Sequence, residues 1–543
     1  MATPSSSTEG WSFRDTYVGP ISLATGIAYL FYIAHETAAL GFRSPPAAFG
    51  AVAKRCSDPF NNTTCVEVEA QSEVGVVNVD RMIAMASFTA LLLTVVIALC
   101  FAKLPEAIDS KHNNRGLAQF SSLFYRKGGA FTDFLNGLPY VLNLLPTATV
   151  YMGIYLYRES GNDWATWFTF IAGFVLVPLF DLIVGEDSYN PTPAEEAALI
   201  KNPWFSRHLI LYTWAYVAGL GALCCYIGQQ SGYIGGGPNV LSPVAFWGIA
   251  ISTGIASGFG IGCIHELMHR PTFFEMNHSR LVLLFSNYNQ FWVEHLWGHH
   301  KRVATDEDPA SSSLNEPFWT FIFRCIWQSL VSALRLEAKF QERKGRSFFC
   351  VQNRILVPYL VSFSIDYAIY KFCGPQALMF QLIQSWFTIF LTDNANYIEH
   401  YGLRRKRLSD GKDQWGLHSE YERTGWMHAW NTGDRISNWM LFKIERHPDH
   451  HVNAGRPYQI LRTMKESPTY PTGYAGMFVL SWLPPAFFAC MNPLVHKAHA
   501  ELEEQIKTGK YAQIFPKGSN TVSSAYKAVG GDHFEQNSVK KEE

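Results

Sequence analysis

The sequence predicts an all-α, polytopic membrane protein with about eight transmembrane helices and a histidine-rich cytoplasmic face. Charged residues make up only 16% of its 543 residues, whereas a soluble domain has about 25%. Several apolar stretches approach the roughly 20 residues that a helix needs to cross the hydrocarbon core. The chain carries 44 basic and 45 acidic residues, so it has no net field that attracts nucleic acid.

Residues 1–130 are expected to form an N-terminal transmembrane hairpin and a cytoplasmic loop. Residues 1–16 are polar and lack the charged-then-apolar pattern of a cleaved signal peptide. The segments Val18–Leu40 and Met82–Ala102 are apolar enough to span the membrane, and the second contains no charge. The basic segment 103–134 that follows is typical of a cytoplasmic loop.

The loop between these two spans combines features of an oxidising compartment. It holds Cys56 and Cys65, together with overlapping glycosylation sequons at Asn61 and Asn62. Sequons also arise by chance, but a nearby pair of cysteines favours the lumenal side of a membrane. Glycosylation and a disulfide in this loop both stay open on the sequence alone.

Residues 131–500 are expected to form the main membrane domain, with six more spans. Two further segments are ambiguous. Arg324 interrupts Pro317–Leu336, so that an interfacial helix fits it as well as a span does, and adjacent prolines interrupt Ala475–Leu494. The six expected spans are Leu135–Tyr157, Trp164–Val184, Leu209–Gly228, Leu241–Ile264, Ile355–Tyr370 and Ala377–Thr392.

An N-terminus in the cytoplasm and eight spans place the C-terminus and every histidine cluster on the cytoplasmic side. The positive-inside rule agrees, because the loops assigned to the lumen hold few basic residues, among them Arg43, Lys54, Arg55, Arg158 and Lys371. Residues 501–543 form a polar tail that ends in Lys540, Lys541, Glu542 and Glu543. This ending resembles a dilysine retrieval signal, so we expect a multi-pass protein of the endoplasmic reticulum.

Nine of the 18 histidines fall in short clusters on this predicted face. His265 and His269 stand four apart, as do His295 and His299, and residues four apart share one face of a helix at a Cβ separation of roughly 6 Å, which suits chelation. Nine imidazoles exceed the ligands of one zinc ion, whereas two metals with four or five ligands each use them all. The set is His265, His269, His295, His299, His300, His400, His447, His450 and His451.

Four carboxylates lie among these histidines, namely Glu266, Glu294, Glu399 and Asp449. We expect them to accept the second ring N–H of a ligand and so to fix its tautomer. A surface charge is the alternative for each of them, and a direct bond to a metal also stays open. Imidazole suits iron, copper and zinc alike, so the ligand type does not name the metal.

Two other functions fit parts of the pattern. His265, Glu266 and His269 also spell the zinc-protease motif H-E-x-x-H, with the glutamate as a base, but that function leaves the remaining histidines without a role. A metal transporter or sensor needs polar residues within several spans. Apart from Asp181 and Asp366, the expected spans are apolar away from their cytoplasmic ends.

Ordered motifs give the chain a resemblance to the integral-membrane alkane 1-monooxygenases, which are related to membrane fatty-acid desaturases and xylene monooxygenase. The resemblance covers roughly residues 135–495. It departs from the family over residues 1–130, at Pro448, where a serine is usual, and at the apparent insertion Leu408–Leu417. The motifs are PLFDLIVGEDSYNP at 178–191, HELMHR at 265–270, EHLWGHHKRVATDEDPAS at 294–311, NYIEHYGL at 396–403, HAWN at 428–431, RHPDHH at 446–451 and PTGYAGMFVLSWLPP at 471–485.

The resemblance implies a non-haem di-iron monooxygenase. Two iron ions would activate O2, insert one oxygen atom into the terminal methyl of an alkane or similar alkyl chain, and release the other as water. Hydroxylation or desaturation of an acyl lipid or a ring methyl on the same scaffold is the alternative. An apolar channel from the bilayer to the metals is expected.

The electrons for such a reaction must come from another protein. The ten cysteines form no C-x-x-C pair, so the chain holds no rubredoxin-type iron site of its own. The resemblance implies a rubredoxin, and the endoplasmic-reticulum features make a ferredoxin or a cytochrome b5 type donor equally acceptable. Each is expected to draw on an NAD(P)H reductase.

Overall fold

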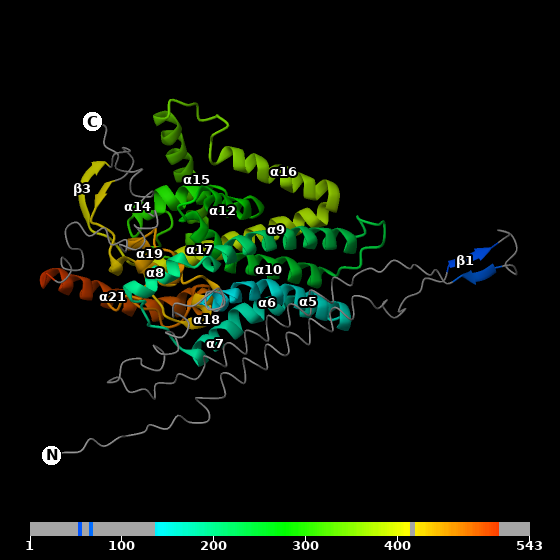
Figure 1. Cartoon of the computed structure of the whole chain (residues 1–543), viewed down its shortest axis with the longest axis horizontal. Helices are drawn as coiled ribbons and strands as arrows, with labels where there is room; N and C mark the ends of the chain where they lie inside the picture. Colours follow the sequence, from blue (N-terminus) through cyan, green and yellow to red (C-terminus); the bar gives the residue numbers. More distant parts are fainter. Residues whose placement is uncertain (1–52, 57–64, 69–135, 413–418, 510–543) are drawn as a thin grey trace, which may run out of the picture. The chain divides into compact units, whose positions relative to one another are not determined.

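The computed structural model describes residues 53–56, 65–68, 136–412 and 419–509 (Figure 1). The chain divides into two compact units, residues 1–96 and 97–543. In the first unit, β1 (Ala53–Cys56) pairs with β2 (Cys65–Val68) as an antiparallel hairpin, and Cys56 stands opposite Cys65 in its register.

Several predictions fall outside the described residues. The spans at 18–40 and 82–102, the sequons and the dilysine-like tail all lie there, so the count of eight spans stays a prediction. The same holds for residues 413–417 of the predicted insertion at 408–417, whereas its first half lies in the strand β3 (Arg407–Lys412). This strand pairs with β4 (Ser419–Tyr421) in a second short antiparallel hairpin.

Apart from this hairpin, the described residues of the second unit form mainly helices, as predicted. Its first half contains η2 (Leu138–Leu144), α5 (Leu145–Ser160), η3 (Asp163–Trp167), α6 (Phe168–Ile171), η4 (Ala172–Leu176), α7 (Val177–Val184), α8 (Pro193–Lys201), α9 (Trp204–Gln230), α10 (Pro243–Phe259), α11 (Ile261–Met268), α12 (Phe273–Phe285) and α13 (Gln290–Val293). Its second half contains η5 (Glu294–His299), α14 (His300–Arg302), α15 (Phe318–Arg343), α16 (Leu356–Cys373), α17 (Pro375–His400), η6 (Trp426–His428), α18 (Arg435–Met440), α19 (His447–Val452), η7 (Tyr458–Ile460), α20 (Tyr474–Ser481) and α21 (Pro484–Lys507).

Three of these helical stretches are long and apolar enough to cross a membrane: Asp163–Val184, Trp204–Gln230 and Pro243–Met268. Each matches a predicted span, which confirms a membrane protein. The third begins where the sequence marks a helix start, because the Ser242 hydroxyl accepts the Ala245 N–H at 3.1 Å and Pro243 occupies the first turn.

The other predicted spans that lie within the described residues also form helices, although they fall outside this set of three. The segment predicted at 135–157 becomes η2 and α5, and the last two become α16 and α17. Gly374, with φ at 93°, makes the turn between α16 and α17, and Pro375 then starts α17.

Close contact between α10 and α17 forms the centre of the bundle. A Cβ added at Gly258 would lie 2.6 Å from Leu391 Cδ1, and one added at Gly254 would lie 2.4 Å from Phe387 Cβ. The two helices approach this closely because neither glycine has a side chain. α11 (Ile261–Met268), which follows α10 directly, carries His265, and α17 ends at His400.

The two ambiguous segments are resolved differently. α15 exposes Trp319, Phe323 and Trp327 at four-residue intervals, with 48%, 64% and 66% of their surface accessible, and buries the opposite face, which is the pattern of an amphipathic helix. The segment 475–494 splits into α20 and α21 at the prolines. α21 continues to Lys507, so the helix runs past the predicted domain boundary at residue 500.

Candidate metal centre

The nine predicted histidines converge from five elements that are far apart in the sequence. α11, η5, α14, α17 and α19 supply them, and they meet at one end of the bundle. Eight of the nine side chains are buried and the ninth, His300, is partly exposed. Their ring nitrogens fall into two groups, and within each group one ligand atom per residue lies within 4.8 Å of all the others.

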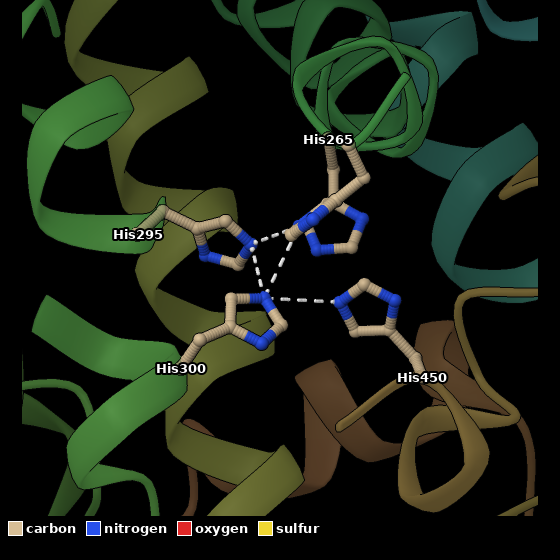
Figure 2. Close-up of side chains that lie close together, drawn as sticks. His265, His295, His300 and His450 are labelled. Atoms are coloured by element: carbon tan, nitrogen blue, oxygen red, sulfur yellow. Dashed lines mark hydrogen bonds between the residues drawn. The ribbon is translucent and has the colours of Figure 1, made fainter. Parts of the chain in front are cut away.

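The first group, called the five-histidine cluster, consists of His265, His269, His295, His300 and His450. The rings point toward one another from different elements (Figure 2). Nε2 of His300 lies 3.1 Å from Nε2 of both His269 and His295, and 3.2 Å from that of His450. The Nε2 atoms of His269 and His295 are 3.0 Å apart.

The second group, called the four-histidine cluster, consists of His299, His400, His447 and His451, all of them buried. Nε2 of His447 lies 3.2 Å from Nε2 of His400 and 2.9 Å from that of His451. Two pairs of adjacent residues are split between the clusters, since His300 and His450 belong to the first and His299 and His451 to the second.

The π-helical turn η5 causes the first of these splits. The four-residue step in the sequence predicts that His295 and His299 share a face, but Glu294–His299 is wound as a π-helix with wider turns. His295 therefore joins His300, five residues later, and His299 faces the other cluster. The sequence pattern paired the wrong residues because it assumed 3.6 residues per turn.

The donor atoms fit metal ions. Two nitrogens bound to one metal at about 2.1 Å and at right angles lie about 3.0 Å apart, which is the spacing within both clusters. Nε2 of His265 and Nε2 of His299 are buried and have no hydrogen-bond partner among the described residues. Burial lowers the pKa of His269 and of His400 to about 3, so both are neutral, as a metal ligand must be.

Three of the four predicted carboxylates form their ion pairs with arginines rather than with cluster histidines. Glu266 pairs with Arg270 at 2.9 Å, Glu294 pairs with Arg302, and Asp449 accepts the N–H of Arg462 at 2.9 Å and lies 3.3 Å from Arg456. A buried carboxylate without a cation is costly, and arginines within reach satisfy these three. Their predicted contact with ligand imidazoles stays a prediction.

Glu399 is the exception among the four. Its Oε2 lies 3.3 Å from Nε2 of His447, the nitrogen that faces the four-histidine cluster. Its Oε1 accepts the Tyr474 hydroxyl at 2.9 Å. Glu399 is therefore the carboxylate for which the alternative of a direct bond to a metal stays open.

Sequence reasoning missed the groups that orient two of the imidazoles. Nδ1–H of His299 donates to Asp308 Oδ2 at 2.9 Å, and Nδ1–H of His400 donates to the backbone carbonyl of His428 at 3.2 Å. Both bonds leave Nε2 with its lone pair toward the cluster. Burial lowers the pKa of His299, but the Asp308 carboxylate outweighs it, so that this pKa is raised.

The family motifs held clues to both groups. Asp308 lies in the stretch EHLWGHHKRVATDEDPAS and the 428 carbonyl in HAWN. The motif at 178–191 also supports the site, because Asp181 accepts the backbone N–H groups of Ile436 and Ser437 at 2.8 and 3.1 Å and so holds the start of α18.

A narrow cavity of about 40 Å³ opens onto both clusters. It is bordered by His265 and His295 of the first cluster, by His447 of the second, and by Glu399. Its other walls are mainly apolar and come from α10, α11, α13, α17, α20 and residues 441–444: Gly258, Ile261, Gly262, Phe291, Leu391, Ala395, Leu441, Ile444 and Phe478.

The sequence is similar to those of known proteins. Residues 239–481, which include all nine histidines, match the model of the fatty acid desaturase family. Alkane 1-monooxygenase 1 of Alcanivorax borkumensis is 34% identical over 390 residues, which make up 92% of that protein and 70% of this chain. The chain belongs to the alkane 1-monooxygenase family. Alkane 1-monooxygenase of Acinetobacter baylyi is also 34% identical, over 60% of this chain and 76% of its own.

A more distant relative has the same type of activity in its name. The hydroxylase component of xylene/toluene monooxygenase from Pseudomonas putida is 24% identical over 55% of this chain and 76% of its own. Membership in the alkane 1-monooxygenase family confirms both the predicted family and the predicted enzyme class, a monooxygenase. These relatives are bacterial, so they lend no support to a location in the endoplasmic reticulum.

Proposed function

We propose that the chain hydroxylates the terminal methyl group of alkanes or similar alkyl chains, with O2 as co-substrate and two iron ions held by the nine histidines. The observation that carries this proposal is the apolar cavity that borders both histidine clusters at once. A substrate group in this cavity would lie next to both proposed metals. The family's named activity supports the same reaction.

The five-histidine cluster would hold one ion, and the four-histidine cluster the other, with Glu399 close enough to complete the second. When bound, the two iron ions supply the oxygen-activating chemistry. The protein's own part is to present neutral imidazoles. It does so by burying them, and it orients the rings of His299 and His400 by engaging their Nδ1–H groups.

The cavity walls explain why an unfunctionalised chain suits this site. Leu391, Leu441, Ile444 and Phe478 offer no charge to bind a carboxylate or a headgroup. Polar groups, including Thr392, Asn396 and Tyr474, occur beside the histidines and Glu399. An alkyl end is therefore held by burial alone, which favours a chain drawn from the lipid phase.

Orientation and partners form the finer part of the proposal. We place the histidine clusters on the cytoplasmic side, since the basic residues concentrate there when eight spans are threaded through the membrane. Electrons come from a separate rubredoxin, ferredoxin or cytochrome b5 type protein and its NAD(P)H reductase. The absence of a C-x-x-C pair in the sequence supports an external donor.

Metal analysis combined with product identification tests the proposal. The full chain, reconstituted in lipid nanodiscs with iron and each donor type, is given dodecane, dodecanoic acid and xylene. We expect two irons per chain and 1-dodecanol from dodecane. An active protein with one zinc and no iron would refute the di-iron centre, and products from dodecanoic acid or xylene without any from dodecane would favour the sibling reactions.

Single histidine variants refine this test. His451→Ala removes a member of the four-histidine cluster and is expected to abolish hydroxylation and lower the iron content. His278→Ala is the matched control, because His278 lies on α12 outside both clusters. Full activity in His451→Ala would contradict the assignment of its cluster.

A further inference from the structure

Two cysteines meet at the end of the bundle opposite the histidine clusters. Cys225 lies near the C-terminal end of α9 and Cys373 is the last residue of α16. Their Sγ atoms are 3.9 Å apart. α17 starts two residues after Cys373 and runs for 26 residues to His400, a distance of about 39 Å, so the cysteine pair is remote from the proposed metal centre.

The backbones around this pair are already in contact. Gly228 follows Cys225 by three residues on α9, and a Cβ added to it would lie 2.6 Å from the carbonyl oxygen of Cys373 and 3.2 Å from its Cα. Tyr233 closes the contact from the other side, because its hydroxyl donates to the Lys371 carbonyl at 3.0 Å. A disulfide requires Cα atoms within about 7 Å, which suits backbones packed this closely.

Cys225 lies five residues before the end of α9, near the membrane surface from which a water-soluble oxidant would approach. Cys225 is exposed and Cys373 is buried beside it. α9 is 27 residues long, about 40 Å, which exceeds a hydrocarbon core of about 30 Å. Its polar end at Gln229 and Gln230, together with Lys371 on α16, marks the level of the membrane surface.

We propose that Cys225 and Cys373 form a redox-sensitive disulfide that joins α9 to α16. The threading expected from the sequence places this end of the bundle on the non-cytoplasmic side of the membrane. Disulfides persist on that side, because it is the more oxidising one. Seven of the described cysteines have free thiols. Cys224 is the matched neighbour, since it is adjacent in sequence but buried.

The reaction is a thiol–disulfide exchange with a low-molecular-weight disulfide such as oxidised glutathione. The exposed Cys225 thiolate attacks one sulfur of the oxidant and releases one glutathione. Cys373 then attacks Cys225 Sγ and releases the second. One Sγ–Sγ bond forms and one oxidant bond breaks, while two electrons and two thiol protons leave with the two glutathione molecules.

The bond would close a long loop of functional importance. The two cysteines are separated by 148 residues, and the segment between them contains α10 to α15 and five of the nine cluster histidines. A cross-link across such a loop restricts the unfolded chain. We therefore expect the oxidised protein to melt several degrees higher than the reduced one.

Thiol labelling on the full chain in nanodiscs tests the proposal. The protein is treated with oxidised glutathione or with a reductant, blocked with N-ethylmaleimide, and mapped by mass spectrometry without reduction. We expect a cross-linked peptide pair containing Cys225 and Cys373 only after oxidation. It should persist in Cys224→Ser and vanish in Cys225→Ser, which should also lose the oxidation-dependent rise in melting temperature.

Three outcomes would overturn the proposal. They are maleimide on both cysteines after oxidation, a stable glutathione adduct on Cys225 without the cross-link, and a cross-link that uses Cys224 instead. Each is read on the native sequence, so it does not depend on how well a variant folds. None bears on the hydroxylation proposed above.

Discussion

At the residue scale, the proposed metal centre depends on groups that orient its imidazoles. Asp308 accepts Nδ1–H of His299, and the 428 carbonyl accepts that of His400. Each bond selects one tautomer before any metal arrives, so that Nε2 is ready to bind. Glu266, Glu294 and Asp449 instead hold arginines that join neighbouring segments of the site.

Replacing Asp308 tests this orienting role. In Asp308→Asn the charged acceptor of His299 is lost while the shape is kept, and changes of this kind typically lower metal affinity or activity about 10- to 100-fold. Asp306→Asn is the control, since Asp306 is exposed and pairs with Arg404 on the surface. Iron content and turnover are measured together, and native values in Asp308→Asn would contradict the role.

Removal of iron exposes the titration of the buried imidazoles. Burial holds the pKa of His269 and His400 at about 3, whereas an unfolded histidine has about 6.5. Below pH 6.5 the unfolded chain binds more protons than the folded one, so stability falls as the pH is lowered toward 3. Each group contributes up to about 1.4 kcal/mol per pH unit.

Thermal melts of the iron-free protein measure this dependence. The melting temperature is expected to drop from pH 7 to pH 5. The drop should be smaller in His269→Gln, which cannot gain the proton. A melting temperature that does not change over this range would show that the folded apoprotein protonates these histidines readily.

At the element scale, the sequence predicts helices better than it predicts their local winding. Most of the expected spans from residue 135 onward match helices within a few residues, because apolar runs bounded by glycine and proline define them. The π-helical turn η5 has no such signal. Its extra residue per turn separates His295 from His299, and only the packed structure shows this.

The sequence also does not predict which distant groups accept the Nδ1–H of each cluster histidine. Asp308 is one of many carboxylates in the chain. The backbone carbonyl of His428 is one of hundreds of carbonyl groups. Their roles depend on how loops fold back over the helix ends. A buried carboxylate can pair with either an arginine or an imidazole, and spacing along the chain does not decide between them.

The contact between α10 and α17 sets the size of the apolar cavity. Leu391 borders the cavity and also touches Gly258. Leu391→Ala is expected to enlarge the cavity and shift the preference toward longer alkanes. Gly258→Ala should push the leucine inward and disfavour them, with changes on the order of 10-fold in relative kcat/KM.

A panel of alkanes of increasing length measures these shifts as ratios of kcat/KM. Leu382→Ala is the control, because Leu382 lies on the same helix with 49% of its surface exposed and does not border the cavity. If the ratios of kcat/KM were unchanged in both test variants, the cavity would not determine which alkane is preferred.

At the scale of the whole molecule, the membrane organises the chain around one end of the bundle. The histidine clusters and the hairpin of β3 and β4 follow the ends of α11 and α17, whereas the cysteine pair lies at the other end. The amphipathic α15 presents its aromatic stripe, Trp319, Phe323 and Trp327, as an interfacial helix does. A single protease experiment can establish the orientation of the chain in the membrane.

Trypsin on sealed vesicles of known sidedness checks the proposed orientation. Lys406 and Arg407 are exposed and should be cleaved only when the cytoplasmic face is outside. Lys371 lies near the C-terminal end of α16, away from the histidine clusters. It should be cleaved only in vesicles of the other sidedness. The reverse pattern would place the histidine clusters on the far side of the membrane.

Because adjacent histidines are divided between the clusters, we expect metal uptake to be cooperative. A first ion that fixes His300 and His450 also fixes the peptide units carrying His299 and His451, so the second ion binds a site whose ordering entropy has already been lost. Iron added in steps to the apoprotein should yield empty and doubly loaded chains, with few singly loaded ones, as native mass spectrometry would count them. A large singly loaded population at half-saturation would show that the two sites fill independently.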